Sequence, residues 1–150
     1  MELSQDFREF IKLLNKNKVE YLLAGGYAVA AHGYPRFTGD LDVWIKPSPE
    51  NATQVLEALK EFGFSSIDIG QEDLIEENIV IQLGYPPFRI DLITGLSGLQ
   101  FDECWPNRNV IKDKEGNELP FLGLKDLITN KKATNRDQDK IDIKHLREPN

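Results

Sequence analysis

Residues 24–45 read AGGYAVAAHGYPRFTGDLDVWI, and this stretch decides how the chain folds. It opens with a glycine pair, Gly25 and Gly26, and two aspartates separated by one leucine, Asp40 and Asp42, come near its end. Side chains two residues apart on a strand point to the same face, so both carboxylates project together. Two such charges about 4 Å apart repel by roughly 4 kcal/mol at an effective dielectric of 20. The pair therefore indicates either a bound cation or a position in open water.

The pattern around the glycines predicts a strand, a helix and a second strand. VEYLLAG at 19–25 is typical of a short buried strand, and YAVAAH at 27–32 of a helix packed tightly on a sheet. GYPRFTG at 33–39 is a loop, because glycine and proline interrupt regular structure. The following strand is LDVWI at 41–45, and the two aspartates lie at its beginning, so we expect them near a sheet edge that is open to a ligand.

The rest of the chain mixes helices and strands in an order typical of an α+β domain. We expect helices at 4–17, 48–62, 123–134 and 137–147, a hairpin of strands at 78–84 and 88–94, a helical turn at 101–105, and short strands near Val110 and Leu119. No repeat or linker divides the chain. We therefore expect one domain over 1–150, with a mixed sheet flanked by helices, a core at about 18–122 and a C-terminal helical segment at about 123–150.

Composition limits the class of protein and its partners. The 150 residues are 40% hydrophobic and 29% charged, which suits a globular domain with a real core. A net charge of −7 argues against broad nucleic-acid binding, which usually needs a basic face. No apolar run approaches the roughly 20 residues that span a bilayer, so we expect no membrane partner. The N-terminus has no apolar signal region, and the single Cys104 fits a reducing cytoplasm, where we expect the protein to reside.

A third acid has a similar setting. Asp91 lies in the middle of the predicted strand FRIDLIT, and it would join the other two acids if that strand lay beside 41–45. A cluster of carboxylate oxygens suits Mg²⁺ or Mn²⁺, which also bind substrate phosphates. Zinc is disfavoured, because neither His32 nor His145 has a ligand partner at a suitable spacing. Two alternatives stay open for Asp91, namely exposure to solvent on a one-sided sheet or a pair with Arg89.

The glycine pair has two interpretations of its own. Gly25 and Gly26 lie where a strand ends and a helix begins, and backbone N–H groups at such a junction attract phosphate, which glycine allows to approach closely. The alternative is a tight turn with no ligand. Neither the Rossmann pattern GxGxxG nor the P-loop ending GK[ST] is present, so those two classes of nucleotide site are excluded.

A glycine pair, a helix, a strand with two aspartates and a later strand with a third aspartate together resemble the nucleotidyltransferases of the DNA polymerase beta superfamily. VEYLLAGGYAVAAHGYPRFTGDLDVWIKPSPENATQVLEALKEFGF is similar to small bacterial nucleotidyltransferase-like proteins related to AbiEii-type toxins and minimal nucleotidyltransferases. RIDLITGLSGLQFDECW and LKDLITNKKATNRDQDKIDIKHL extend the likeness, which covers most of 18–147. The fold that it implies is the nucleotidyltransferase fold.

The resemblance also implies an activity. A nucleoside monophosphate would pass from an NTP to a hydroxyl acceptor on a protein, an RNA or a small molecule, and pyrophosphate would leave. Asp40, Asp42 and Asp91 would be the catalytic residues and would hold Mg²⁺ or Mn²⁺. The triphosphate would contact residues on both sides of the acids: Gly25, Gly26, Arg36, Thr38, Lys131 and Arg136.

Several alternatives remain at this point. Arg36 equally suits a pair with a local acid, and Lys131 and Arg136 equally suit pairs with Asp139 or Asp142 between the last two helices. A non-catalytic nucleotide-binding module, or a partner in a toxin–antitoxin pair, is possible in a chain with no separate acceptor-binding domain. The three intact acids argue against it. Dehalogenase-like phosphatases also use two spaced aspartates, but there the acids follow the apolar strand.

Overall fold

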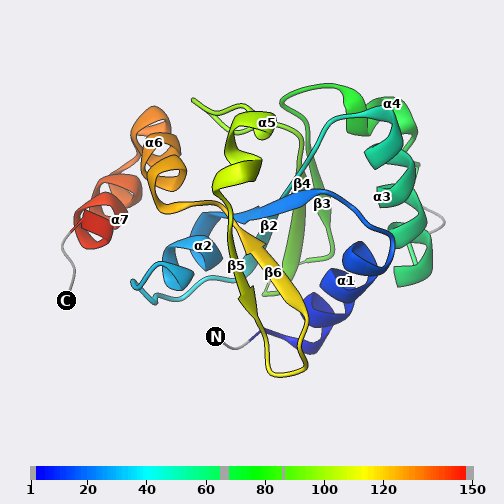
Figure 1. Ribbon diagram of the computed structural model, residues 1–150, viewed down its shortest axis with the longest axis horizontal. Helices are drawn as coiled ribbons and strands as arrows, with labels where there is room; N and C mark the ends of the chain where they lie inside the picture. The colour runs from blue at the N-terminus through cyan, green and yellow to red at the C-terminus, as the bar shows by residue number, and fades with distance from the viewer. Residues whose placement is uncertain (1–2, 65–67, 86, 148–150) are drawn as a thin grey trace.

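The centre of the molecule is a six-stranded sheet with the order β3-β4-β2-β1-β6-β5 (Figure 1). The computed structural model describes residues 3–64, 68–85 and 87–147. Its strands are β1 (Tyr21–Ala24), β2 (Asp40–Ile45), β3 (Val80–Leu83), β4 (Arg89–Ile93), β5 (Asn109–Lys112) and β6 (Glu118–Phe121). β2 pairs parallel with β4 and antiparallel with β1, while β1 pairs parallel with β6. The sheet is therefore mixed, as the sequence predicts.

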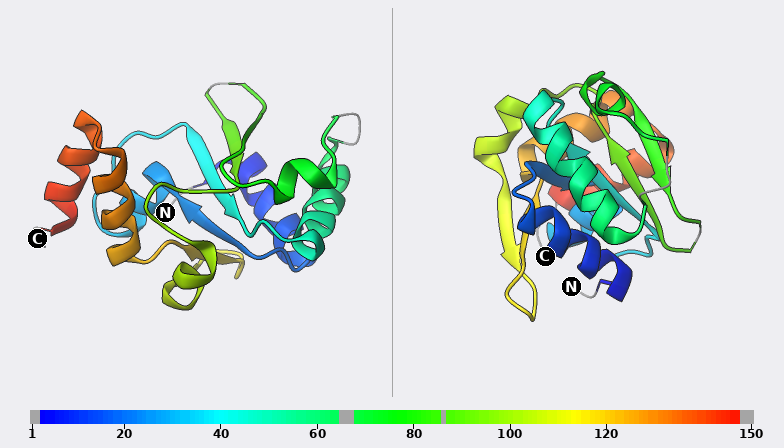
Figure 2. Two further views of the ribbon diagram at one scale, coloured as in Figure 1. Left: turned by 90° about the horizontal axis from the view of Figure 1, so that it is seen from above. Right: turned by 90° about the vertical axis from the view of Figure 1, so that its right-hand side faces the viewer.

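Helices pack at both ends of the sheet. They are α1 (Gln5–Lys16), α2 (Gly25–Ala31), α3 (Pro49–Phe62), α4 (Gln71–Ile75), α5 (Phe101–Cys104), α6 (Leu124–Thr134) and α7 (Asp137–Arg147). At one end α1 packs on α3 and α3 on α4, and at the other end α6 packs on α7 (Figures 1 and 2). This arrangement confirms the expected α+β class with C-terminal helices.

Local sequence explains where the longer helices start and stop. The Ser4 hydroxyl caps α1 by accepting from the Phe7 N–H at 3.2 Å, and Ser48 caps α3 just before Pro49. Gly63, with φ +103°, ends α3 in the left-handed conformation that favours glycine. The sequence did not predict α4, because its five residues are too few to show a helical period.

The stretch 24–45 folds with small shifts from the expected boundaries. The helix begins at Gly25 rather than Tyr27, so both glycines belong to the first turn of α2, and β2 begins at Asp40. Leu41 and Val43 are fully buried on one face of β2. Asp40, Asp42 and Trp44 alternate with them and share the other face.

Two further sequence expectations concern the surroundings. Cys104 is a buried free cysteine, as expected of a packed residue. Within residues 3–64, 68–85 and 87–147, none of the helices has the length and apolar character that crossing a membrane requires.

Candidate active site

The acids meet because β2 and β4 are adjacent and parallel. In that register Asp42 lies beside Asp91 and Asp40 lies beside Arg89. On the other side of β2, Asp42 is paired with Ala24, the last residue of β1 before α2 begins. Residues aligned across neighbouring strands share a face of the sheet. The three acids and the glycine turn therefore converge, which the sequence predicts only on the condition that these strands are neighbours.

The glycine pair is required by close contacts with two of the site residues. A Cβ atom on Gly25, whose φ is +64°, would overlap Oδ2 of Asp42. A Cβ atom on Gly26 would lie 2.5 Å from the Thr38 hydroxyl oxygen. Any larger residue would thus displace Asp42 or Thr38. Glycine permits a close approach here, as expected, and the groups that approach are side chains of the site itself.

Arg89 joins two of the acids. Its Nη2 atom lies 2.8 Å from Oδ2 of Asp40, and its Nε atom lies 2.8 Å from Oδ1 of Asp91. A second bond of 3.1 Å runs from Nη2 to the other oxygen of Asp91. The pair between Asp91 and Arg89, one of the two alternatives left open by the sequence, is therefore present. Sequence reasoning did not place Arg89 against Asp40, although the spacing of Arg89 and Asp91 puts both on one strand face.

Asp42 has a raised pKa. Burial is the main cause, the nearby charges of Asp91 and Asp40 add to it, the charges of Lys131 and Arg89 oppose it, and together they bring the pKa of Asp42 to about 6. Within the described parts of the chain, the Asp42 side chain accepts no hydrogen bond. An acid that is half-buried among like charges and lacks a donor is a strong candidate for a cation ligand.

The basic residues from the C-terminal helices form a buried ion network. Lys131 is 4% exposed, and its Nζ atom lies 3.2 Å from Oδ1 of Asp139 and 3.1 Å from Oδ2 of Asp142. Arg136 bonds to Asp139 at 2.9 Å. Burial opposes the ionisation of Asp139, but hydrogen bonds from Arg136 and Thr134 outweigh it and hold the pKa of this carboxyl well below its usual range. Lys131 and Arg136 therefore make the helix-to-helix pairs that the sequence left as an alternative.

Arg36 connects the loop before β2 to this network. Its Nε and Nη2 atoms donate to the two oxygens of Asp142, each at 3.0 Å, in a bidentate pair. Beside this pair, the Tyr34 ring stacks on His145 with ring centroids 3.9 Å apart. The loop at 33–39 is thus held on α7 by two contacts from its own residues.

One pocket of about 610 Å³ brings the predicted residues together. Asp40 and Asp42 line it, and so do all six residues assigned to the triphosphate: Gly25, Gly26, Arg36, Thr38, Lys131 and Arg136. Asp91 does not line this pocket. It is 8% exposed and bonded to Arg89. Phe37, which sequence reasoning missed, also lines the pocket and is 89% exposed.

Comparison with protein families matches residues 3–150 to the one described as "Nucleotidyl transferase of unknown function (DUF2204)". The chain belongs to this family. Six chains of solved structures also match, among them a Thermotoga maritima protein assigned provisionally as a nucleotidyltransferase. That protein is 16% identical, the match covers 94% of this chain and 88% of that one, and the TM-score is 0.58, so the likeness shows the fold. A comparison with curated proteins gave no match.

The residues of this nucleotidyltransferase-family protein fit a divalent cation at two carboxylates. Within the described residues, no group of three or more His, Cys, Asp or Glu side chains is arranged to hold a metal ion. Asp91 and one oxygen of Asp40 are bonded to Arg89. Asp42 has no donor and a raised pKa, and it shares its strand face with Asp40. Because Mg²⁺ often uses one or two carboxylates together with substrate phosphates, Asp40 and Asp42 fit it.

Proposed function

We propose that this nucleotidyltransferase moves a nucleoside monophosphate from an NTP to a hydroxyl acceptor with Mg²⁺ or Mn²⁺, and that pyrophosphate leaves. The observation that carries the proposal is the composition of the 610 Å³ pocket. Two carboxylates on β2 face cationic side chains from the loop at 33–39, from α6 and from the turn between α6 and α7 across one space. A metal–triphosphate complex needs this combination, since the carboxylates take the cation and the basic side chains take the phosphates.

Asp40 and Asp42 would hold the metal, which when bound neutralises phosphate charge and lowers the pKa of an attacking hydroxyl. Asp91 would complete the site and accept the proton of the acceptor hydroxyl. In the described structure its oxygens are 2.8 and 3.1 Å from Arg89, so Arg89 has to release at least one of them. Arg89 is thus a positioning residue whose movement precedes the transfer.

Each basic residue of the pocket would contribute to triphosphate binding in a different way. Arg136 has a side chain that is 71% exposed, and its Nε and Nη2 atoms bond to Asp139, so it would donate to a phosphate from Nη1. Lys131 is fixed between two buried aspartates, and its positive charge lowers the pKa of Asp42 from a distance. Arg36 and Thr38 would hold phosphate oxygens from the loop that Asp142 anchors.

The second candidate function is nucleotide binding without turnover, including the role of a partner in a toxin–antitoxin pair. One observation favours it: Arg89 already supplies a positive charge between Asp40 and Asp91, where an active enzyme needs room for a cation. Under this alternative the pocket binds NTP, but no label reaches an acceptor.

The test is an assay with α-labelled NTP, Mg²⁺ or Mn²⁺ and cell extract, in which label is followed on protein, RNA and small molecules. We expect transfer by the wild type and none by Asp42→Asn, with Asp68→Asn as a matched control because Asp68 is exposed and lies outside the pocket. Equal transfer by wild type and Asp42→Asn in clean preparations would overturn the catalytic assignment. NTP binding without transfer by the wild type would support the second candidate.

A further inference from the structure

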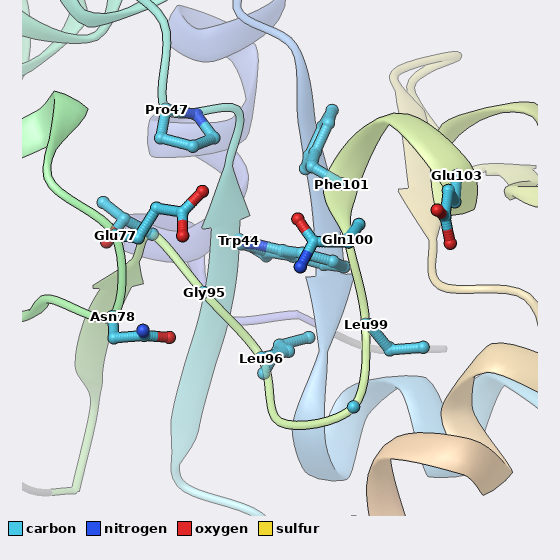
Figure 3. Close-up of a pocket in the computed structure, with 12 residues that line it drawn as sticks. Trp44, Pro47, Glu77, Asn78, Gly95, Leu96, Leu99, Gln100, Phe101 and Glu103 are labelled. Atoms are coloured by element: carbon cyan, nitrogen blue, oxygen red, sulfur yellow. The ribbon is translucent and has the colours of Figure 1, made fainter.

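A second pocket, of about 280 Å³, lies further along the same face of β2 as the acids. Trp44 follows Asp42 by two residues and therefore shares its face of the strand. The indole lies across the floor of this pocket, and the segments 77–78 and 94–101 form its walls (Figure 3). The pocket shares no lining residue with the 610 Å³ pocket, so it is a separate space.

The Trp44 indole N–H is a buried donor with no acceptor. The residue is 1% exposed, and its Nε1 atom has no hydrogen-bond partner in the part of the chain that the structure describes. Phe101 fixes the ring edge-to-face, with centroids 5.2 Å apart. A buried donor left without a partner costs about 1–3 kcal/mol, and such a group calls for an explanation.

Gln100 covers the indole from the pocket side. Figure 3 shows the Gln100 amide in front of the Trp44 ring, and the indole nitrogen at the end of the ring nearer Glu77. Gln100 is exposed, and no hydrogen bond of its side chain is found within the described residues. Its amide can therefore turn aside without losing a partner, and an acceptor atom in the pocket then reaches the indole N–H.

The walls of the pocket are held by hydrogen bonds and close contacts. The Thr94 hydroxyl accepts from the Ile79 N–H at 2.8 Å and donates to the Glu76 carbonyl at 2.7 Å, which ties the segment before β3 to β4. Asn78 has a φ of +63°, and its side-chain oxygen would overlap a Cβ atom on Gly95. Glycine at 95 therefore leaves room for the Asn78 amide. The pocket is largely preformed, as ligand pockets usually are.

The charge of the pocket selects the kind of ligand. Glu77 and Glu103 line it, and no lysine, arginine or histidine does. Neither carboxylate is in an ion pair within residues 3–64, 68–85 and 87–147. Lys46 lies next to the lining residue Pro47 but is already paired with Glu20 and Asp102, each at 3.5 Å. An anionic group such as a triphosphate is thus repelled here, whereas an ammonium group is attracted.

We propose that this pocket binds a small organic cation that carries a neutral oxygen acceptor. The acceptor receives the Trp44 indole N–H, the carboxylates of Glu77 and Glu103 attract the ammonium group into the pocket, and the amides of Asn78 and Gln100 bond to the remaining polar atoms. The proposal rests on this pocket alone and holds whether or not the chain transfers nucleotides.

The test follows the Trp44 indole N–H by NMR in the Trp105→Phe variant. The chain has two tryptophans, so this variant leaves the Trp44 indole N–H as the one indole resonance. The probe is 2-(2-aminoethoxy)ethanol. Two matched ligands are diethylene glycol, which lacks the charge, and pentylamine, which lacks the oxygens. We expect saturable movement of the resonance with the probe, binding about two- to fivefold weaker for diethylene glycol, as for loss of one exposed ion pair, and no downfield shift with pentylamine.

Variants separate the site from a general charge effect. Glu77→Gln/Glu103→Gln should weaken probe binding at least twofold, whereas Glu9→Gln/Glu57→Gln removes two exposed acids on α1 and α3 and should leave binding unchanged. All four residues are exposed, so these variants are expected to fold. The proposal is overturned if the resonance does not move saturably with the probe. It is also overturned if the two double variants bind alike, or if diethylene glycol binds as tightly as the amine.

Discussion

Gly25 and Asp42 are in direct contact, so that a Cβ atom on the glycine would occupy the place of a carboxylate oxygen. The contact joins the first turn of α2 to the acid face of β2. Residue 25 therefore has to be glycine for Asp42 to keep its position.

Gly25→Ala should therefore lower both stability and any transfer activity. A left-handed φ costs a non-glycine residue roughly 1–2 kcal/mol, and displacement of Asp42 adds to it. Gly116→Ala is the matched control, because Gly116 also has a positive φ, of +85°, but a Cβ atom there meets nothing within 4 Å. Urea unfolding should show a larger decrease in the free energy of unfolding for Gly25→Ala than for Gly116→Ala. Equal decreases would mean that the contact with Asp42 does not contribute to stability.

The raised pKa of Asp42 predicts a pH dependence of stability. Its ordinary pKa is 3.8 and burial raises it to about 6, so between these values the folded state binds the proton more tightly than the unfolded state. The contribution of Asp42 to the free energy of unfolding is thus most favourable below about pH 4 and is lost as the pH rises through 6. For a shift of two pKa units, this loss is at most about 3 kcal/mol. Asp42→Asn should become progressively more stable than the wild type across that window. Parallel stability curves would contradict the prediction.

Replacement of Arg89 tests its competition with a metal. Arg89→Gln leaves Asp40 and Asp91 without their shared cation, and we expect a lower free energy of unfolding because the pairs are only partly exposed. Saturating MgCl₂ should raise the melting temperature of this variant more than that of the wild type, because metal can take over the charge. Arg89→Lys keeps the charge and serves as control. An identical response of all three proteins to Mg²⁺ argues that the acids do not bind it.

Neighbouring lysines on α6 should differ sharply in their effect. Lys131→Met removes one of the two cationic partners of each fully buried aspartate, since Arg136 still bonds to Asp139 and Arg36 to Asp142, and breaking a buried pair typically costs about 3–5 kcal/mol. Lys132→Met changes an exposed residue, and its free energy of unfolding should stay within about 0.5 kcal/mol of that of the wild type. Chemical unfolding measures both, and hydrogen exchange should show faster opening of α7 in the first variant only. Similar losses for the two variants would refute the network as a source of stability.

Most of the secondary structure follows from local sequence, and the site follows only in part. Ser4, Ser48 and Gly63 act within one helical turn, so caps and ends can be predicted from neighbouring residues. The strand expected at 41–45, which is observed as Asp40–Ile45, and the hairpin whose second strand contains Asp91 follow from local sequence for the same reason.

Contacts between distant segments could not be predicted. The bond between Arg36 and Asp142 joins residues 106 positions apart, and the sequence offered only that Arg36 suits some local acid. The role of Arg89 depends on β2 and β4 being neighbours in one particular register. No local pattern fixes that register, since it is set by packing of the whole sheet.

The bond between Arg36 and Asp142 also has a consequence during synthesis. A ribosome releases the loop at 33–39 long before α7, because the chain emerges from its N-terminus. The nascent protein therefore carries Arg36 and Lys131 without their counter-ions until Asp139 and Asp142 have left the exit tunnel. The 610 Å³ pocket is completed only when Lys131, Arg136 and Gln138 have been translated, so a product truncated before them cannot present it.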